Sequence, residues 1–306
     1  ASRIWDNVES EPESPLPLTD RYETTGNSMK IPQMFESSRK QGAGKRFAGI
    51  QTTWFDEAEE IQATKFTTKK MSMEVHKLGA VAYVTEEMLD DGGQITERFL
   101  NRRVPDAIRF AVIQAFIDGS GVAKPHGVLR SDAAIEIALE AGQGNHTILH
   151  RNVNNMYWRN WARSRAIWYG HPDLVQQLEF MSFNDDTANQ RPVYLPANQV
   201  VNSPFGVLYG RPVVPYEFMP DFGSRGDLAF IDWSQYATLT KVGGGVKTAV
   251  SIHVRFLHEE TAFRFTFRID GRSLWPSPKE DLNGDTTRSP FVLMPARTGG
   301  TTSSGL

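Results

Sequence analysis

The sequence predicts an α+β fold, and three observations support this class. Apolar residues recur at helical spacing over residues 95–119, which predicts one long amphipathic helix. Residues 246–256 and 263–269 alternate apolar and polar side chains, as the two strands of an antiparallel hairpin do. Short strand and helix patterns alternate between residues 128 and 240. We expect the long helix to be the element around which the chain is organised.

Length and composition exclude several classes of protein. The 306 residues suffice for two packed domains, and their net charge of −3 argues against a protein that mainly grips nucleic acid. No apolar run approaches the length of a transmembrane helix. The absence of cysteine removes disulfides, thiolate metal sites and cysteine nucleophiles. The sequence starts at Ala1 without a signal-peptide pattern, so we expect it to have been shortened, by proteolysis or otherwise.

The first 83 residues contain little that could form a core. Residues 1–30 are rich in Glu and Pro, and such an arm needs a neighbouring subunit to hold it. Strand candidates at residues 51–55 and 64–75 form a long polar hairpin, which is more credible as a strap between subunits than as a free lobe. Residues 77–85 then alternate apolar and polar side chains and lead the chain to the long helix.

The long helix has a predicted start, end and bend. An acidic, glycine-containing stretch at residues 90–93 precedes it, and Gly119 and Gly121 mark its end. Pro105 removes one backbone donor and should bend the helix. Its predicted buried face shares apolar character and helical spacing: Ile95, Phe99, Val104, Ile108, Ala111, Val112, Ala115 and Phe116.

The remaining elements follow from shorter patterns. We expect a helix over residues 153–165, a buried strand at 166–169, and a second helix in which Pro172 occupies the first turn. A further strand is expected at residues 228–233. In the late hairpin, residues 258–260 form the turn.

Six segments in order carry a resemblance to a known family. They are residues 77–91, the helix with Gly119-Ser-Gly121 and Pro125-His-Gly127, and residues 166–172, 208–220, 227–236 and 268–271. Over about residues 31–275, the sequence resembles the major capsid protein of tailed bacteriophages, with the Hong Kong 97-type fold (HK97-like) that encapsulins share. The resemblance implies an N-arm at 1–34, an E-loop at 35–80, a P-domain at 81–130 and 241–278, an A-domain at 131–240, and a C-terminal tail at 279–306.

The same resemblance implies a function and partners. The expected function is that of a major capsid protein, trimmed at its N-terminus, whose hexamers and pentamers form an icosahedral shell around double-stranded viral DNA. The implied partners are other copies of the chain through E-loop and N-arm contacts, a portal protein, a maturation protease and, in some relatives, a decoration protein. DNA would be contacted non-specifically, with no membrane involved. Assembly would occur in the host bacterial cytoplasm, and the product would be the virion capsid.

One departure from the family concerns covalent cross-linking. Some members join an E-loop Lys to a P-domain Asn with the help of a Glu. Lys65, Lys69 and Lys70 are available here, and Glu259 or Glu260 could assist, but residues 241–274 contain no Asn. We therefore predict that this chain forms no isopeptide cross-link.

Candidate chemical sites have plainer explanations. His146 and His150 have a spacing that zinc sites use, yet an ordinary polar turn is favoured because the zincin Glu is missing. Gly243-Gly-Gly245 could cradle a phosphate, but it lacks the Lys-Ser/Thr ending, so a turn between strands is favoured. The paired acids at residues 86–87 and 90–91 fit a helix start. The aromatic residues could stack nucleic-acid bases, but we assign most of them to the core: Tyr157, Trp158, Trp161, Trp168 and Tyr169.

Two functional hypotheses from different classes remain. A structural shell protein explains the strap, the arm and the lack of an assembled nucleophile, base and orienting group. For it we expect no catalytic residue, cofactor or metal, with an encapsulin-like compartment as the near alternative. The other hypothesis is a soluble hydrolase or transferase whose acids come from Asp90, Asp118 or His126.

Overall fold

The computed structural model describes residues 14–34, 36–40, 46–50, 52, 54–57, 68–182, 192–197, 205–243 and 245–297. The chain forms two compact units. Unit 1 comprises residues 1–31, 70–130 and 236–273, and unit 2 comprises residues 32–69, 131–235 and 274–306. The predicted arm before residue 14 lies outside the described residues, as does most of the predicted strap. Of the strand expected at residues 51–55, residues 52, 54 and 55 are described and do not form a strand.

Unit 1 is built on a five-stranded sheet around the long strand β13 (Glu260–Ser273). β4 (His76–Thr85) pairs with β13 along one edge. The other edge is shared by β12 (Lys247–Arg255) and β11 (Tyr236–Lys241), which pair with successive parts of β13. β1 (Asp20–Thr24) lies parallel to β11. The predicted late hairpin, β12 and β13, is confirmed, and its turn includes Glu259 with a left-handed backbone.

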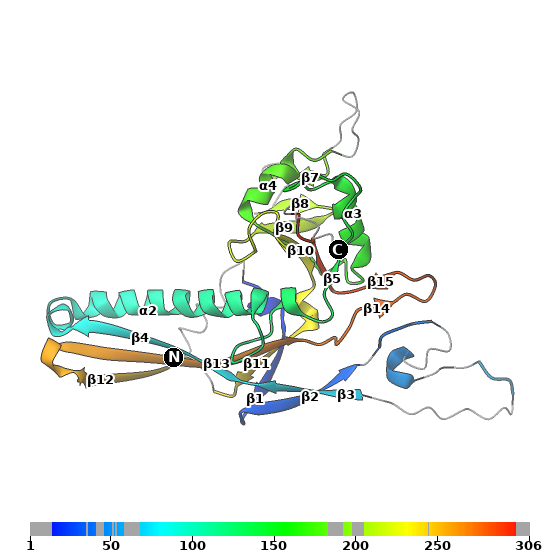
Figure 1. Cartoon of the computed structure of the whole chain (residues 1–306). Coiled ribbons are helices and arrows are strands. Elements are labelled where there is room, and N and C mark those ends of the chain that lie inside the picture. The colour runs from blue at the N-terminus through cyan, green and yellow to red at the C-terminus, as the bar shows by residue number, and fades with distance from the viewer. Residues whose placement is uncertain are drawn as a thin grey trace, which may run out of the picture. The chain divides into compact units, whose positions relative to one another are not determined.

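The long helix α2 (Glu86–Asp118) packs on one face of this sheet (Figure 1). Alternate β13 side chains, Phe265, Phe267 and Ile269, are buried in unit 1. The helix contributes buried apolar residues at helical spacing: Val104, Ile108, Val112, Ile113, Phe116 and Ile117. Phe116 contacts Tyr236 of β11, with ring centroids 5.1 Å apart.

Three expectations for this helix were wrong. It begins at Glu86 rather than at residue 95, because the Thr85 side chain caps it by accepting a hydrogen bond from the Met88 N–H. The break in helical backbone angles falls at Gly92, whereas Pro105 lies inside continuous helix. A glycine loses helical geometry more easily than a proline whose ring is buried, as Pro105 is. Phe99, predicted to be in the core, is 60% exposed.

Unit 2 contains a seven-stranded sheet, in the order β5-β16-β10-β6-β9-β8-β7. Its strands are β5 (Ile135–Glu136), β6 (Ile167–Gly170), β7 (Tyr194–Leu195), β8 (Gly206–Leu208), β9 (Arg211–Pro215), β10 (Leu228–Ile231) and β16 (Phe291–Leu293). α3 (His150–Arg159) and α4 (Pro172–Glu179) accompany it. The centre is aromatic: Trp168 stacks on Phe230 at 4.1 Å between ring centroids, and both side chains are fully buried.

The strand β6 and the helix α4 that follows it confirm the buried strand and the second helix predicted from the sequence. Pro172 occupies the first helical turn, and the His171 side chain accepts a hydrogen bond from the Asp173 N–H. Leu174 and Leu178 are completely buried. The helix expected over residues 153–165 is shorter, since α3 ends at Arg159.

In unit 2, residues 36–40, which precede the strap, are anchored to a small hairpin, β14 (Lys279–Glu280) and β15 (Thr287–Arg288). Ser38 forms a parallel bridge with Glu280, whose N–H donates to the Ser37 carbonyl at 3.0 Å. The Glu280 carbonyl accepts from the Arg39 N–H at 3.2 Å. The buried Lys279 ammonium lies 3.8 Å from the buried Glu36 carboxylate. It also sits over two rings, 4.2 Å from the centroid of Trp161 and 5.3 Å from that of Trp275.

The remaining described elements are short. β2 (Ser28–Met34) and β3 (Thr68–Glu74) form a two-stranded sheet. Single-turn 3-10 helices occur at Leu16–Leu18, Arg46–Gly49, Val128–Arg130, Trp233–Gln235 and Phe256–His258. Among the described helices, none has a stretch that is long and apolar enough to cross a membrane.

Candidate assembly surfaces

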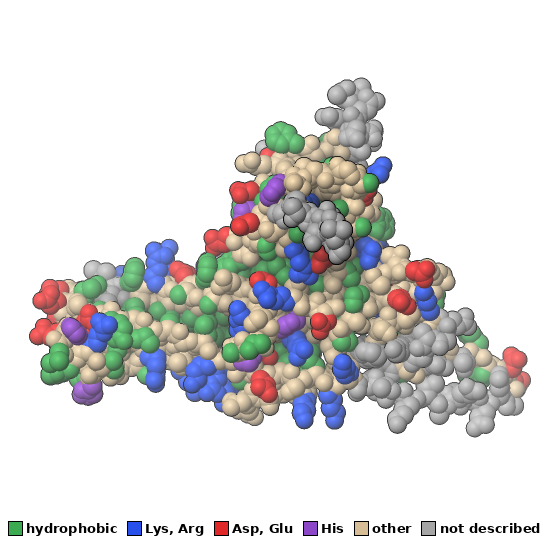
Figure 2. Space-filling model, viewed as in Figure 1, with side chains coloured by type: hydrophobic (Ala, Val, Ile, Leu, Met, Phe, Trp, Pro, Cys, Tyr) green, Lys and Arg blue, Asp and Glu red, His purple; other side chains and the backbone are tan. Residues whose placement is uncertain are grey.

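The tip of the β12–β13 hairpin exposes a band of apolar side chains. β12 lies at the end of the strand order, and its apolar residues Val250, Ile252 and Val254 are exposed, Val254 at 63%. Phe256 and Leu257 in the turn are more exposed still, Leu257 at 92%. Figure 2 shows hydrophobic side chains gathered at this end of unit 1, with charged residues among them. A strand edge with exposed apolar side chains is suited to contact with another chain.

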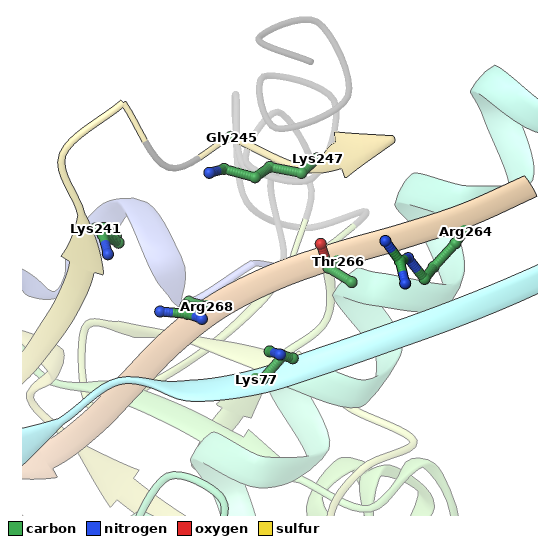
Figure 3. Close-up of a pocket in the computed structure, with 7 residues that line it drawn as sticks. All are labelled: Lys77, Lys241, Gly245, Lys247, Arg264, Thr266 and Arg268. Atoms are coloured by element: carbon green, nitrogen blue, oxygen red, sulfur yellow. The ribbon is translucent and has the colours of Figure 1, made fainter. Parts of the chain in front are cut away.

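The sheet face that points away from α2 carries a cluster of basic side chains. There a pocket of about 390 Å³ is lined by Lys77, Lys241, Gly245, Lys247, Arg264, Thr266 and Arg268 (Figure 3). Register explains the cluster: Arg268 is paired with Lys77 of β4, and Thr266 with Lys247 of β12. Side chains two residues apart on a strand share a face, so Arg264, Thr266 and Arg268 all project to the same side.

The pocket is strongly electropositive, because five cationic side chains line it and, among the described residues, no acidic side chain does. None of the five takes part in a described ion pair. Arg268 donates a hydrogen bond from Nη1 to the Asn27 side-chain oxygen at 2.9 Å, which leaves its charge uncompensated. Like charges gathered in a concave surface raise the local positive potential and attract anions.

A second pocket in unit 1, of about 360 Å³, contains titratable groups. It is lined by Ser72, Glu74, His76, Ser120, Gly121, His126, Asp270, Gly271 and Arg272. Burial raises the pKa of Asp270, whose carboxylate accepts hydrogen bonds from the N–H groups of Gly271 at 2.8 Å and Glu74 at 3.1 Å. His76 Nε2 lies 3.9 Å from the same carboxylate. Through these hydrogen bonds, Asp270 holds the backbone of Glu74 and Gly271 in place.

The acids considered for a hydrolase have separate positions and roles. Asp118 forms a two-pronged ion pair with Arg130, at 2.7 and 2.9 Å. The backbone N–H of His126 donates to the Gly271 carbonyl at 2.8 Å, and the backbone carbonyl of His126 accepts from the Tyr236 hydroxyl at 2.9 Å. Glu86, Glu87 and Asp90 lie in the first turns of α2, where negative charge favours the helix. Among these groups the structure shows no paired nucleophile and base.

The histidine pair and the glycine run also have structural roles. His146 Nδ1 is 3.0 Å from the Phe222 carbonyl, and His150 Nε2 is 2.7 Å from the Tyr209 hydroxyl. Their ring nitrogens therefore contact different partners, and no group of metal-binding side chains occurs among the described residues. Burial lowers the pKa of His150. Gly243 and Gly245 lie in the turn between β11 and β12, and Gly244 falls outside the described residues.

The aromatic group at residues 157–169 is mostly core, as predicted. Trp168 and Tyr169 are buried, and Tyr157 stacks on Tyr209 at 5.1 Å. Trp158 is exposed, with the Arg163 guanidinium 4.5 Å from its ring centroid. The basic pocket was not predicted from the sequence. Its five cationic residues are spread from residue 77 to residue 268, and only the strand register brings them together.

Comparison with solved structures identifies the class of fold. The chain is similar to the capsid of an empty GTA particle, with 18% identity, a TM-score of 0.66, and coverage of 93% of this chain and 90% of that one. A Microbacterium phage Oxtober96 chain gives 15% identity and a TM-score of 0.61, covering 94% and 93%. An encapsulin from Synechococcus elongatus gives 12% and 0.57, covering 95% and 90%. The fold is thus the HK97-like shell fold.

The family assignment follows from the sequence itself. The model of the phage capsid family matches residues 21–278, which is most of the chain. The chain therefore belongs to the phage capsid family, and it is a major capsid protein of the shell-forming type. Self-association and a place in the virion capsid come with that membership. A comparison with curated proteins gave no significant match.

Proposed function

We propose that this chain closes hexamers and pentamers into an icosahedral shell around double-stranded DNA. The observation that carries the proposal is the match to the phage capsid family over residues 21–278, joined to exposed apolar residues on the β12 edge. One copy would make several different contacts with its neighbours, and each contact would be repeated around the shell. Modest contacts suffice when many of them act together.

The domain division proposed for the chain is that of the family. The N-arm would span residues 1–34, the E-loop 35–80, the P-domain 81–130 and 241–278, the A-domain 131–240, and the tail 279–306. Exposed Trp54 and Phe55 in the E-loop support its use as a strap, since large apolar side chains rarely stay in water without a partner. The β12–β13 hairpin would supply a second contact from the P-domain.

The partners proposed with this function are a portal protein, a maturation protease, packaged DNA and, where the shell is reinforced, a decoration protein. Assembly in the host cytoplasm is part of the same proposal. We also propose that the subunit acts without catalysis. The candidate acids support this, since Asp118 is held in an ion pair with Arg130 and Asp90 lies near the start of α2.

The test is assembly of the full-length chain, followed by light scattering and negative-stain electron microscopy. We expect uniform closed shells, roughly tens of nanometres across, as many repeated contacts predict. Val254→Lys should abolish them, because it places an ammonium in the apolar band, while the subunit stays folded. Leu139→Lys is the matched control in unit 2, where an exposed apolar residue is likewise replaced. A chain that stays monomeric or dimeric across salt and pH would overturn the proposal.

The encapsulin alternative is decided by the contents of the shell. Shells purified from infected cells should contain double-stranded DNA protected from nuclease. Shells that enclose protein and no DNA would assign the chain to a cellular compartment instead.

A further inference from the structure

The turn between β14 and β15 contains the one Asn-Gly step in the sequence, Asn283-Gly284. Glycine has no Cβ, so little keeps the Asn side chain away from the next peptide nitrogen. Residues 282–285 are exposed, and the turn is closed by a hydrogen bond from the Asp281 N–H to the Thr286 carbonyl at 3.2 Å. Water therefore reaches both the side-chain amide and the nitrogen that follows it.

The two groups are free to meet in the folded chain. Of the described residues, none accepts a hydrogen bond from the Gly284 N–H, and none holds the Asn283 amide. Gly284 has a left-handed backbone, with a φ of 91°, and a Cβ built on it would meet nothing within 4 Å. The side chain of Asn283 can therefore rotate onto the Gly284 nitrogen.

A second exposed step in unit 1 provides a contrast. Asn27 is followed by Ser28, which has a Cβ. Arg268 donates a hydrogen bond to the Asn27 side-chain oxygen at 2.9 Å, and the Asn27 carbonyl accepts from the Val75 N–H at 2.9 Å. A side chain held in this way must first leave its partner before it can approach the next nitrogen.

We propose that Asn283-Gly284 is a site of spontaneous deamidation, at which the folded chain modifies itself. The Gly284 nitrogen loses its proton and bonds to Asn283 Cγ, while the Cγ–Nδ2 bond breaks and ammonia leaves. The product is a succinimide ring, which water opens at either carbonyl carbon. Opening at Cγ leaves aspartate. Opening at the main-chain carbonyl leaves isoaspartate, in which the backbone runs through Cγ and is one carbon longer.

The modification changes the turn that anchors residues 36–40. Position 283 lies between Asp281, whose N–H closes the turn, and Asp285, whose Oδ1 contacts the Lys40 ammonium at 2.7 Å. The extra backbone carbon of isoaspartate alters the spacing between these two residues. The closing hydrogen bond to Thr286 and the contact with Lys40 can then no longer both keep their geometry. The modified turn therefore holds residues 36–40 less firmly.

The site is tested on the full-length subunit, incubated at pH 9 and then mapped by peptide mass spectrometry. We expect the mass increase of replacing –NH2 by –OH at Asn283, at least fivefold faster than at Asn27. The rate should rise with pH, because the attacking nitrogen must lose its proton. Asn283→Gln is the matched control: its longer side chain would have to close a larger ring, so this position should stay unmodified.

Unfolding in urea separates the effect of the fold from that of the sequence. The rate at Asn27 should rise severalfold, since Arg268 no longer holds its side chain, while the rate at Asn283 should stay nearly the same. A rate at Asn283 that is no faster than at Asn27 in the folded subunit would overturn the proposal. So would a severalfold rise at Asn283 on unfolding, because the folded turn would then protect the amide.

Limited trypsin cleavage tests the consequence for the anchor. Incubated subunits that contain isoaspartate should be cut after Arg39 and Lys40 severalfold faster than fresh ones, with no change after Arg225, which is exposed in another loop of unit 2. Incubated Asn283→Gln should be cut at the fresh rate. Equal cleavage after Arg39 and Lys40 before and after modification would overturn the effect on the anchor. These measurements use the unassembled subunit, so they do not depend on shell formation.

Discussion

Arg297 anchors the C-terminal segment of unit 2, and its replacement by Met should be severely destabilising. Arg297 is 3% exposed and its partner Asp227 is fully buried. One guanidinium nitrogen donates to Asp227 Oδ2, which also accepts from the Gly223 N–H at 2.9 Å. The Leu228 N–H donates to Oδ1, also at 2.9 Å. Removing Arg297 leaves a buried carboxylate held only by backbone groups.

The expected cost is about 3–5 kcal/mol, which is the usual penalty for breaking a buried pair and leaving one charge uncompensated. Arg225→Met provides a matched control in the same unit. Arg225 and Glu136 form a 2.5 Å ion pair, but both side chains are more than two-fifths exposed. Exposed pairs contribute about 0–1 kcal/mol. Replacing Asp227 with Asn in the Arg297→Met background should recover part of the loss.

The pH dependence gives an independent check. Burial raises the pKa of Asp227, and the hydrogen bond from Arg297 opposes that rise. In Arg297→Met the opposing contribution is gone, so the folded-state pKa moves further above the unfolded value. A carboxyl with a raised folded-state pKa favours the folded state as pH falls. The deficit relative to the native sequence should therefore shrink between pH 7.5 and pH 5.

The assay is urea unfolding of the unassembled subunit, followed by tryptophan fluorescence at both pH values. The reasoning is refuted if Arg297→Met loses no more stability than Arg225→Met. It is also refuted if the deficit grows as pH falls, because that would mean the carboxylate is not the group left unpaired.

Three further predictions follow from other features. Gly119→Ala should destabilise unit 1 by about 2–3 kcal/mol in thermal melts, because the added Cβ would overlap the carbonyl oxygens of Pro125 and Ala115. Gly93→Ala is the control: its added Cβ meets nothing within 4 Å, so it should stabilise the helix by about 0.5–1 kcal/mol in the same melts. Deleting residues 42–68 should leave helical circular dichroism intact and prevent shell assembly, and loss of the helical signal would show that the segment supports the core. Assembled shells boiled in detergent should run only as the 34.4 kDa monomer, whereas a ladder of covalent oligomers would contradict the absence of isopeptide cross-links.

Local patterns predicted the elements whose residues lie close together in sequence. Alternation identified the β12–β13 hairpin, and Pro172 with its neighbours identified the start of α4. Both depend on backbone rules that act over a few residues. The helix α2 was recognised and its end at Gly119 was predicted, but its start was not, because the Thr85 cap begins a further helical stretch ahead of the break at Gly92.

Features that depend on distant pairing could not be predicted. β1 lies parallel to β11, more than two hundred residues later, and no local signal indicates that register. The basic pocket depends in the same way on three strands aligning Lys77, Lys247 and Arg268. No local signal indicates that Lys279 is buried, since its two aromatic neighbours and Glu36 come from separate parts of the chain.

The anchorage of residues 36–40 has a mechanical consequence. The bridge between Ser38 and Glu280 is parallel, and its hydrogen bonds are flanked by the buried Lys279–Glu36 pair and by the Lys40–Asp285 contact. If a neighbouring subunit pulls on the strap, the force acts on these contacts at the same time, so they would have to break together and not one after another. The β14–β15 hairpin would then bear the force, and the force would not be transmitted to the buried aromatic residues of unit 2.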